Sequence, residues 1–414
     1  MRKICLLLVF MVPITLGLFS SQEKKEEANV VALIGGTLID GTGASPVQNT
    51  TVLIEGKKIK AVGPMDKVKV PAGAKKIIVS GKWILPGFID AHMHLTYPGD
   101  DYQHFTQTDS LATLRALHFM NMFLRCGITS VREVGAPVEP MMALNEAAQL
   151  GYIDTIRLFS CGQLLTVTGG HGSELKLARE VDGPWEWRKA VREMHEAGFD
   201  HIKISPTYTM EEAKAAVDEA KTLGMRITSH GGGLSDTTPT TMTRIAVQAG
   251  VQCIEHLNEM EDDVLDLIAE KGVYLVPTIS IYREQYKEND IPGILIEKRG
   301  WTVSLHETLF KKARARKITM GIGTDAVGRF MKLYPILYFM EMKYFVELGA
   351  NPMEAIIAAT RNGALILGKE DVLGTIQEGK LADIQVVNGD PLKSLDVLGR
   401  PEIVIRGGTV HDFK

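Results

Sequence analysis

The chain has 414 residues, of which 45% are hydrophobic and 23% are charged, and its formal net charge is −4. These values are typical of a globular protein with a large core, and the scattered basic residues exclude a nucleic-acid or anionic-membrane surface. Of the four cysteines, Cys5 lies in an N-terminal apolar run. The other three, Cys126, Cys161 and Cys253, are an odd number at wide spacing, which excludes a disulfide framework.

The N-terminus has the layout of an export signal. Arg2 and Lys3 precede an apolar run over residues 4–19, which is too short to span a membrane comfortably. We therefore predict a signal peptide over residues 1–21, a polar spacer over 22–29, and a periplasmic or secreted protein. An uncleaved anchor is the alternative, and it would be the chain's one contact with a membrane.

Short β-branched segments bounded by Gly, Pro and Asp occupy residues 30–80, and the same pattern returns over residues 375–414. Because the two ends of a chain often lie close together, these segments predict one small β-domain, a β-sandwich built from both termini.

The middle of the chain, residues 81–374, alternates strand and helix patterns. Helices are expected over 210–224 and 264–272, each ending at a glycine. Eight strands are expected, over residues 83–94, 127–136, 155–163, 199–205, 225–231, 251–258, 273–280 and 318–326. Eight such units in series indicate an α/β fold, a (β/α)₈ TIM barrel. A doubly wound open sheet is the competing interpretation, and the chemistry at the strand ends favours the barrel.

Chemically active side chains recur at the C-terminal ends of these strands, which converge on one mouth of a barrel. They are His92, His94, Lys203, His230, His256 and Asp325. His92 and His94 are alternate residues of one strand and therefore point the same way. Imidazole and carboxylate groups bind zinc-like ions, whereas an ammonium group would repel them. Lys203 fits this set only if it is deprotonated, or if carbon dioxide has converted it to a bridging carbamate.

In this order, the segments GFIDAHMH, HIKIS, SHG, IEHLN and GTDA resemble the amidohydrolase superfamily. The closing segments GKLADIQVVNGDPL and IVIRGGTVHD fit as well, so the resemblance covers nearly all of the chain after residue 30. It is closest to the metal-dependent dipeptidase and prolidase-like branch, which has a GGHG stretch like that at residues 169–172. The ordered set is specific, although no single motif is decisive.

The resemblance implies a site with two divalent metal ions, most simply Zn²⁺. The first two histidines and Asp325 would bind one ion, His230 and His256 would bind the other, and an N-carboxylated Lys203 would bridge them. A metal-bound hydroxide would attack the substrate, and Asp325 would pass its proton to the leaving amine. The expected substrate is a small molecule with an amide bond, such as a dipeptide or an N-acyl amino acid.

Other functions stay open at this point. A deaminase or cyclic-amide hydrolase of the same superfamily would use similar residues, often with one metal and no bridging lysine. Lactone or phosphotriester hydrolysis also suits a two-metal site. A binding protein without turnover is a further alternative, and a homo-oligomer is possible.

Four more residues have expected positions. His171 would line the substrate pocket or cap its loop. Tyr208 would bond the scissile carbonyl or lie at the surface. His201 lies two residues before Lys203 in the same strand, so its side chain should point the same way. It is expected one layer deeper in the barrel, as a packed residue. Glu255 would point away from the mouth in a regular strand.

Overall fold

The computed structural model describes residues 29–97, 107–173, 177–232, 239–287, 303–327 and 333–413. The predicted signal peptide and nearly all of the predicted spacer lie outside these ranges. Among the helices in the described ranges, we find none with the length and apolar character needed to cross a bilayer.

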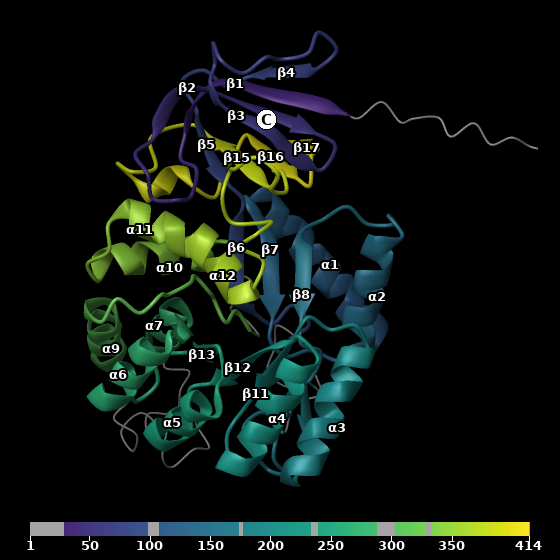
Figure 1. Cartoon of the computed structure of the whole chain (residues 1–414), viewed down its shortest axis with the longest axis vertical. Helices are drawn as coiled ribbons and strands as arrows, with labels where there is room; N and C mark the ends of the chain where they lie inside the picture. Colours follow the sequence, from purple (N-terminus) through teal and green to yellow (C-terminus); the bar gives the residue numbers. More distant parts are fainter. Residues whose placement is uncertain are drawn as a thin grey trace, which may run out of the picture.

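Both ends of the chain contribute to one sheet of eight strands that lies at one end of the molecule (Figure 1). Its order is β17-β16-β15-β5-β1-β2-β3, and β4 pairs with β1 outside this path. An apolar cluster that includes Val31, Leu33, Val52 and Ile54 packs within it. The strands are β1 (Val30–Leu38), β2 (Val47–Glu55), β3 (Lys58–Pro64), β4 (Lys75–Ile78), β5 (Trp83–Pro86), β15 (Ile384–Val387), β16 (Ile403–Arg406) and β17 (Thr409–Asp412). The strands are connected as one sheet, so the predicted two-sheet sandwich is not confirmed.

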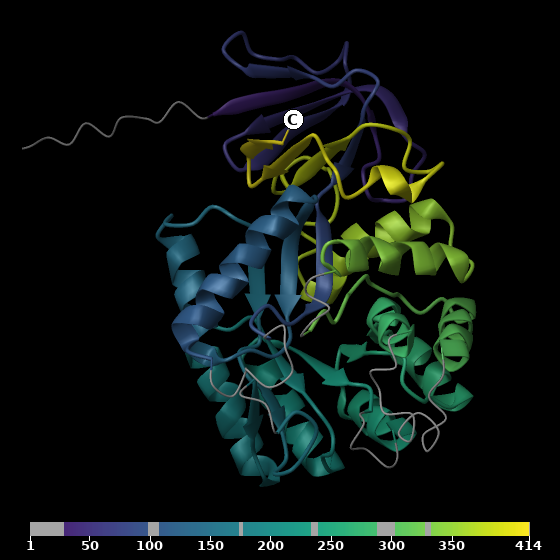
Figure 2. The same ribbon diagram turned by 180° about the vertical axis from the view of Figure 1, so that it is seen from behind.

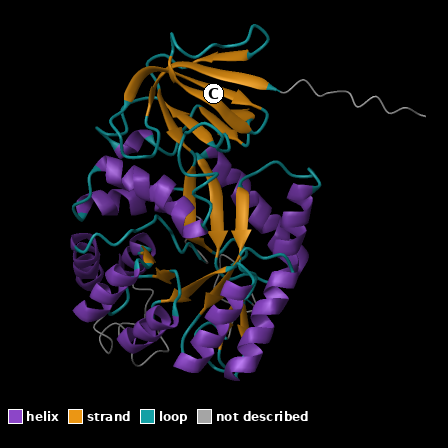
Figure 3. Ribbon diagram, in the orientation of Figure 1, coloured by secondary structure: helices purple, strands orange, loops and turns teal. Residues whose placement is uncertain are grey.

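The strand expected over residues 83–94 is in fact two strands in different sheets. β5 pairs with β1 and β15, whereas β6 (Phe88–Met93) pairs with β7 (Ile128–Glu133). Gly87 alone separates β5 from β6, and a Cβ atom there would lie 2.2 Å from Oγ1 of Thr129. Only glycine permits this close approach. In Figure 3 the arrows of the neighbouring strands point away from the terminal sheet, so their C-terminal ends lie far from it.

The remaining strands are parallel and lie in two sheets. One has the order β6-β7-β8 and the other β10-β9-β11-β12-β13-β14. Their bounds are β8 (Arg157–Ser160), β9 (Leu164–Thr166), β10 (Ala178–Glu180), β11 (His201–Ile204), β12 (Arg226–His230), β13 (Cys253–Glu255) and β14 (Tyr274–Val276).

Backbone hydrogen bonds also connect the two parallel sheets. The amide of Leu275 in β14 bonds the carbonyl of Thr319, and the amide of Ala91 in β6 bonds the carbonyl of Ile322. The segment 319–325, the expected eighth strand, therefore runs between β14 and β6. The hydrogen-bonded pairs of the described strands do not close into one continuous sheet. The structure therefore confirms the predicted alternation of strands and helices but not closure of the barrel.

The helices flank the parallel strands (Figures 2 and 3). They are α1 (Asp109–Arg125), α2 (Val138–Gln149), α3 (Gly183–Glu196), α4 (Met210–Thr222), α5 (Pro239–Ala249), α6 (Asp262–Lys271), α7 (Ile279–Lys287), α9 (Val303–Ala315), α10 (Ile336–Glu347), α11 (Pro352–Ile357), the π-helix η3 (Ala358–Asn362), α12 (Gly363–Leu367) and the 3₁₀ helix η4 (Leu395–Val397). Thr209 and Glu212 form a capping box that starts α4, and Gly272 ends α6 in the left-handed conformation. Both helices confirm the sequence prediction.

Candidate active site

His92, His94 and Asp325 meet at the C-terminal ends of β6 and of the eighth segment. Oδ1 of Asp325 lies 3.3 Å from Nε2 of His92 and 3.4 Å from Nε2 of His94. One ligand atom from each residue lies within 4.8 Å of the other two. The two histidines are buried. This arrangement agrees with the prediction from their i, i+2 spacing.

The spacing of these atoms fits a bound metal ion. In a tetrahedral site with bonds of about 2.0–2.1 Å, two ligand atoms lie about 3.3 Å apart. The two Nε2–Oδ1 distances match this separation. Two imidazoles and one carboxylate are also the donor types of a catalytic zinc site, which leaves a position free for substrate or water.

His256 and His230 extend the cluster beyond His92. The ring of His256 lies 4.7 Å from that of His92 and 4.4 Å from that of His230, between centroids. Nδ1 of His256 is also 3.9 Å from Oδ2 of Asp325. The ring of His171 lies 4.3 Å from that of His230. Five predicted site residues therefore form one continuous group, with His171 beside His230.

Lys203 is buried in β11, opposite Thr228 of β12. Burial and the charge of Arg132 lower the pKa of Lys203, whereas Glu255 and Asp325 raise it, and the net effect is a lowered pKa. Burial is the main cause that lowers the pKa values of His230 and His256, and the charge of Lys203 adds to it. Lys203 therefore lies close enough to interact electrostatically with the predicted ligands on both sides of the site.

The electrostatic environment sets different protonation states for the histidines. Burial lowers the pKa of His230 and of His256 well below the usual value, so both rings are neutral and keep a lone pair. Burial also acts to lower the pKa of His94, but hydrogen bonds to Asp325 and Glu133 raise it to about 10. The surroundings therefore shift the pKa of His94 in the opposite direction to those of His230 and His256.

A protein acceptor holds the Nδ1 atom of each of three histidines. Nδ1 of His94 is 3.0 Å from the carbonyl oxygen of Gly135, and Nδ1 of His256 is 2.7 Å from Oγ1 of Thr278. Nδ1 of His92 is 2.7 Å from Oε2 of Glu255. Such contacts fix the ring orientation and the tautomer, so that Nε2 is the atom available to a ligand.

The backbone at the site is strained at three places. His256, Thr278 and Asp325 have positive φ angles of 71°, 51° and 51°. Non-glycine residues in this region cost about 1–3 kcal/mol each and concentrate at functional sites. The left-handed turn at His256 also ends the regular side-chain alternation of β13. Glu255 points into the interior on the same face as Cys253, since both contact Arg132, contrary to the expectation; the backbone at His256 then returns the next side chain to the cluster.

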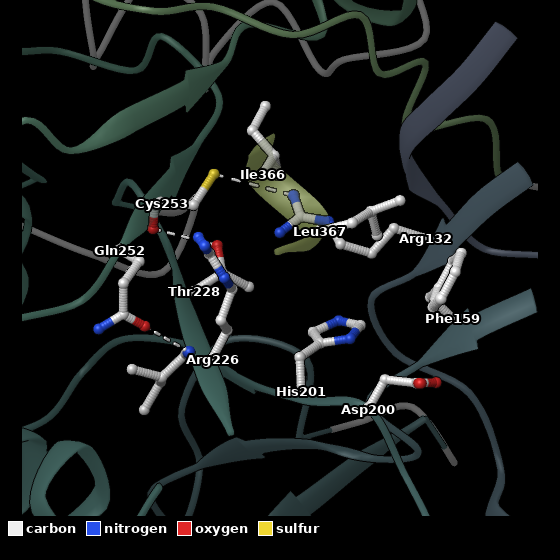
Figure 4. A pocket seen from close by; sticks show the side chains of 11 residues that line it. Arg132, Phe159, Asp200, His201, Arg226, Thr228, Gln252, Cys253, Ile366 and Leu367 are labelled. Atoms are coloured by element: carbon white, nitrogen blue, oxygen red, sulfur yellow. Dashed lines mark hydrogen bonds between the residues drawn. The ribbon is translucent and has the colours of Figure 1, made fainter. Parts of the chain in front are cut away.

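Tyr208 lies near the cluster, whereas His201 lies at the opposite, N-terminal end of β11. Tyr208 is buried; its hydroxyl is 2.6 Å from Oγ of Ser229, and its ring packs against Trp187. His201 is buried as predicted and lines a small cavity near the N-terminal ends of the strands, together with Arg132 and Asp200 (Figure 4). His201 Nε2 has no hydrogen-bond partner among the described residues.

The sequence interpretation gave no site role to Asp90, Arg132, Glu133 or Glu255. Asp90 accepts hydrogen bonds from the His92 amide at 3.1 Å, the Thr324 hydroxyl at 2.7 Å and the Tyr334 hydroxyl at 2.5 Å. It therefore joins β6 to the eighth segment. The i, i+2 spacing of Asp90 and His92 was a usable signal for this placement, since both residues belong to one strand.

The comparison with protein families decides what kind of protein carries this site. The sequence model of the amidohydrolase family matches residues 83–410, which include the whole cluster. This chain belongs to the amidohydrolase family. The assignment confirms the predicted superfamily and makes the protein a hydrolase of amide-type bonds.

Individual relatives agree with this assignment. Ochratoxinase from Aspergillus niger is 28% identical, over 92% of this amidohydrolase and 85% of the relative. Imidazolonepropionase from Symbiobacterium thermophilum is 25% identical, over 80% and 82% of the two chains. The crystal structure of a Xaa-Pro dipeptidase with methionine in its active site has a TM-score of 0.83 and 28% identity, and it covers 93% of this chain and 100% of that one.

Proposed function

We propose that this amidohydrolase is an exported enzyme with two metal ions that cleaves the amide bond of a dipeptide or an N-acyl amino acid. The main support is the distance from Oδ1 of Asp325 to Nε2 of His92 and to Nε2 of His94. Both distances match the separation of two ligand atoms in a tetrahedral metal site. His230 and His256 lie next to this set as neutral imidazoles and would hold the second ion.

The proposal includes a (β/α)₈ barrel as the scaffold. The hydrogen bonds of the segment 319–325 to β14 and β6 support closure on one side. On the other side, the amide of Asp200 bonds the carbonyl of Ser160 and brings β8 next to β11. In such a barrel, the residues at the C-terminal strand ends would share one mouth.

When bound, the metal ions would polarise the scissile carbonyl and lower the pKa of a water to about 7, which makes it a nucleophile near neutral pH. The chain's own residues would supply the proton transfer. Asp325 is well placed as the base, because its carboxylate faces both His92 and His94. Burial acts to raise the pKa of Asp325, but the charge of His92 and hydrogen bonds to His92 and His94 hold it well below the usual value. Asp325 would then pass the proton to the leaving amine.

Lys203 is proposed to carry a carboxylate group on Nζ and to bridge the two ions. Only an uncharged amine reacts with carbon dioxide, and the burial of Lys203 favours that form. Its interactions with His230, His256 and Asp325 support a position between the two halves of the site.

The substrate class rests on the relatives. Ochratoxinase and the Xaa-Pro dipeptidase are the relatives whose names indicate the expected chemistry, and both align over more than nine tenths of this chain. We propose that His171, next to His230, contacts the substrate beside the second ion. A substrate contact for Tyr208 stays a prediction, because its hydroxyl bonds Ser229.

A second candidate is a cyclic-amide hydrolase with one metal ion. Among the described residues, His92, His94 and Asp325 have ligand atoms close enough together to share one metal ion. His230 and His256 are not part of that group, which favours a site with one ion. The similarity to imidazolonepropionase points the same way.

One experiment tests the proposed function directly. The protein is purified with zinc, its metal content is measured, and it is assayed on a panel of dipeptides, N-acyl amino acids, cyclic amides and lactones. We expect about two ions per chain and turnover of linear amides. One ion per chain with turnover of cyclic amides would support the second candidate. A zinc-loaded protein that is inert on the whole panel would refute both.

A further inference from the structure

Beneath the metal-site cluster, a buried carboxylate connects three strands. Glu255, the last residue of β13, has no exposed surface, and its Oε2 atom is 2.7 Å from Nδ1 of His92 in β6. Its Oε1 atom is 2.5 Å from Nη2 of Arg132 in β7 and also accepts a hydrogen bond from the hydroxyl of Thr228 in β12. Each oxygen of this carboxylate therefore has a donor from another strand.

Arg132 is itself fixed on several sides. Its Nε atom donates to the carbonyl oxygen of Ala91 at 2.6 Å, so it is attached to the strand that carries His92. Its Nη2 atom is also 3.8 Å from Sγ of Cys253, the contact drawn in Figure 4. Arg132 is only 3% exposed. The guanidinium plane thus ties β6, β7 and β13 together directly below the cluster.

We propose that Glu255, held by Arg132 and Thr228, is a positioning residue that fixes His92 with Nε2 towards the metal, and that its loss weakens the His92–His94–Asp325 site selectively. This inference rests on the proposed metal centre. The proposed reaction does not itself use the buried network of Glu255, Arg132 and Thr228.

The selectivity follows from a comparison of the histidines. Nδ1 of His256 is held by the neutral hydroxyl of Thr278, and Nδ1 of His94 lies 3.0 Å from the carbonyl oxygen of Gly135 and 3.3 Å from Oε1 of Glu133. Of these three histidines, Glu255 holds only His92. An anionic partner both orients a ligating imidazole and makes its other nitrogen a better donor, and loss of such a partner typically weakens metal affinity about 10–100-fold.

Arg132 pairs directly with this carboxylate. Nη2 of Arg132 lies 2.5 Å from Oε1 of Glu255, and both side chains are buried. A buried charge pair of this kind is costly to break, because the remaining partner stays buried without compensation. Thr228 adds a second donor to the same oxygen, so the carboxylate cannot turn away from His92 without losing a hydrogen bond.

The test compares Glu255→Gln with the wild type and with a matched control. Asp383→Asn is the control, because Asp383 likewise pairs with an arginine, the part-buried Arg157, but in the described part of the chain forms no hydrogen bond with a histidine of the cluster. Zinc content after dialysis and zinc affinity by competition with a chelator are measured for each protein. We expect Glu255→Gln to lose about 10–100-fold in affinity at one of two sites. The control should keep both sites, and wild-type affinity in Glu255→Gln would overturn the proposal.

Two further measurements guard against misfolding of the Gln variant. Thr228→Val removes one donor to Glu255 and should weaken the same zinc site by a smaller factor. In the zinc-loaded wild type, ¹⁵N NMR of the histidine rings should show His92 with its proton on Nδ1 and its metal on Nε2. Metal on Nδ1 of His92 would overturn the proposal without any variant. A wild type that binds no metal would refute both the proposed function and this proposal. A wild type that binds metal, with the same affinity in Glu255→Gln, would refute this proposal alone.

Discussion

Asp325 is joined to His92 twice. Its backbone amide donates to the His92 carbonyl at 2.8 Å, and its carboxylate Oδ1 lies 3.3 Å from the Nε2 atom of the same residue. The left-handed backbone at Asp325, with φ of 51°, aims the carboxylate back at the histidine. The first and the eighth strand segments thus form one half of the proposed metal site as a single rigid unit.

Replacement of Asp325 by Asn should separate catalysis from folding. Asn tolerates the left-handed backbone as well as Asp does, so the fold should be retained. The amide cannot accept a proton, and we expect turnover to fall by about 10²–10⁴-fold. Steady-state kinetics and circular dichroism on the same preparation check this. Turnover close to wild type would exclude Asp325 as the base.

The Lys203→Ala variant tests whether the two ions share a bridge. Removal of the side chain should lower the metal content from about two ions per chain and reduce turnover. Added formate or acetate should restore part of both, because a small carboxylate can occupy the space of the lost carbamate. Lys203→Met, which keeps the apolar stem, should behave like Lys203→Ala. Unchanged metal content and rate in both variants would exclude Lys203 as the bridge, and one ion per chain in all three proteins would favour the one-metal alternative.

The sequence was sufficient to predict which side chains meet at the candidate site, because i, i+2 spacing and position at strand ends are local properties. His92, His94, His230, His256 and Asp325 were all found this way, and the structure brings them together. Glu255 was assigned to the wrong face, because the prediction assumed a regular strand. The positive φ of His256 breaks that alternation, and nothing in the neighbouring residue types indicates it.

The division of the apolar run at residues 83–94 was missed as well. Periodicity does not separate β5 from β6, because the run is apolar on both sides of Gly87, and Pro86-Gly87 was the one local signal of a break. The break depends on the contact of Gly87 with Thr129, which comes from a distant part of the chain. The same limit applies to the terminal sheet, since strand patterns do not reveal whether strands pair in one sheet or two.

Gly323 should prove essential to the position of His92. A Cβ atom at Gly323 would lie 2.3 Å from Cγ1 of Val276 and 2.8 Å from Cβ of His92. Gly323→Ala should therefore displace β6, destabilise the fold by about 1–3 kcal/mol and weaken zinc binding. Gly73→Ala is the matched control, because a Cβ atom there meets nothing within 4 Å. Urea unfolding and zinc titration test both proteins, and equal behaviour of the two variants would contradict the steric argument.

Glu341 should give the protein a pH-dependent stability. This fully buried residue of α10 accepts hydrogen bonds from the amides of Ile279 at 3.0 Å and Ser280 at 2.6 Å, directly after Thr278, the partner of His256. Burial raises the pKa of Glu341 from 4.5 to about 7. The folded state therefore binds this proton more tightly than the unfolded state does. The resulting stability is complete below pH 4.5 and is lost as the pH rises through about 7.

The measurement is the free energy of unfolding in urea at pH 5 and pH 8, for the wild type and for Glu341→Gln, with metal removed from both. Relative to the variant, the wild type should lose about 2–3 kcal/mol between the two pH values. The comparison cancels the titration of the site histidines, which both proteins share. Glu347→Gln, an exposed carboxylate on the same helix, should follow the wild type. If the wild type and Glu341→Gln have parallel pH profiles, burial of a protonated Glu341 is excluded.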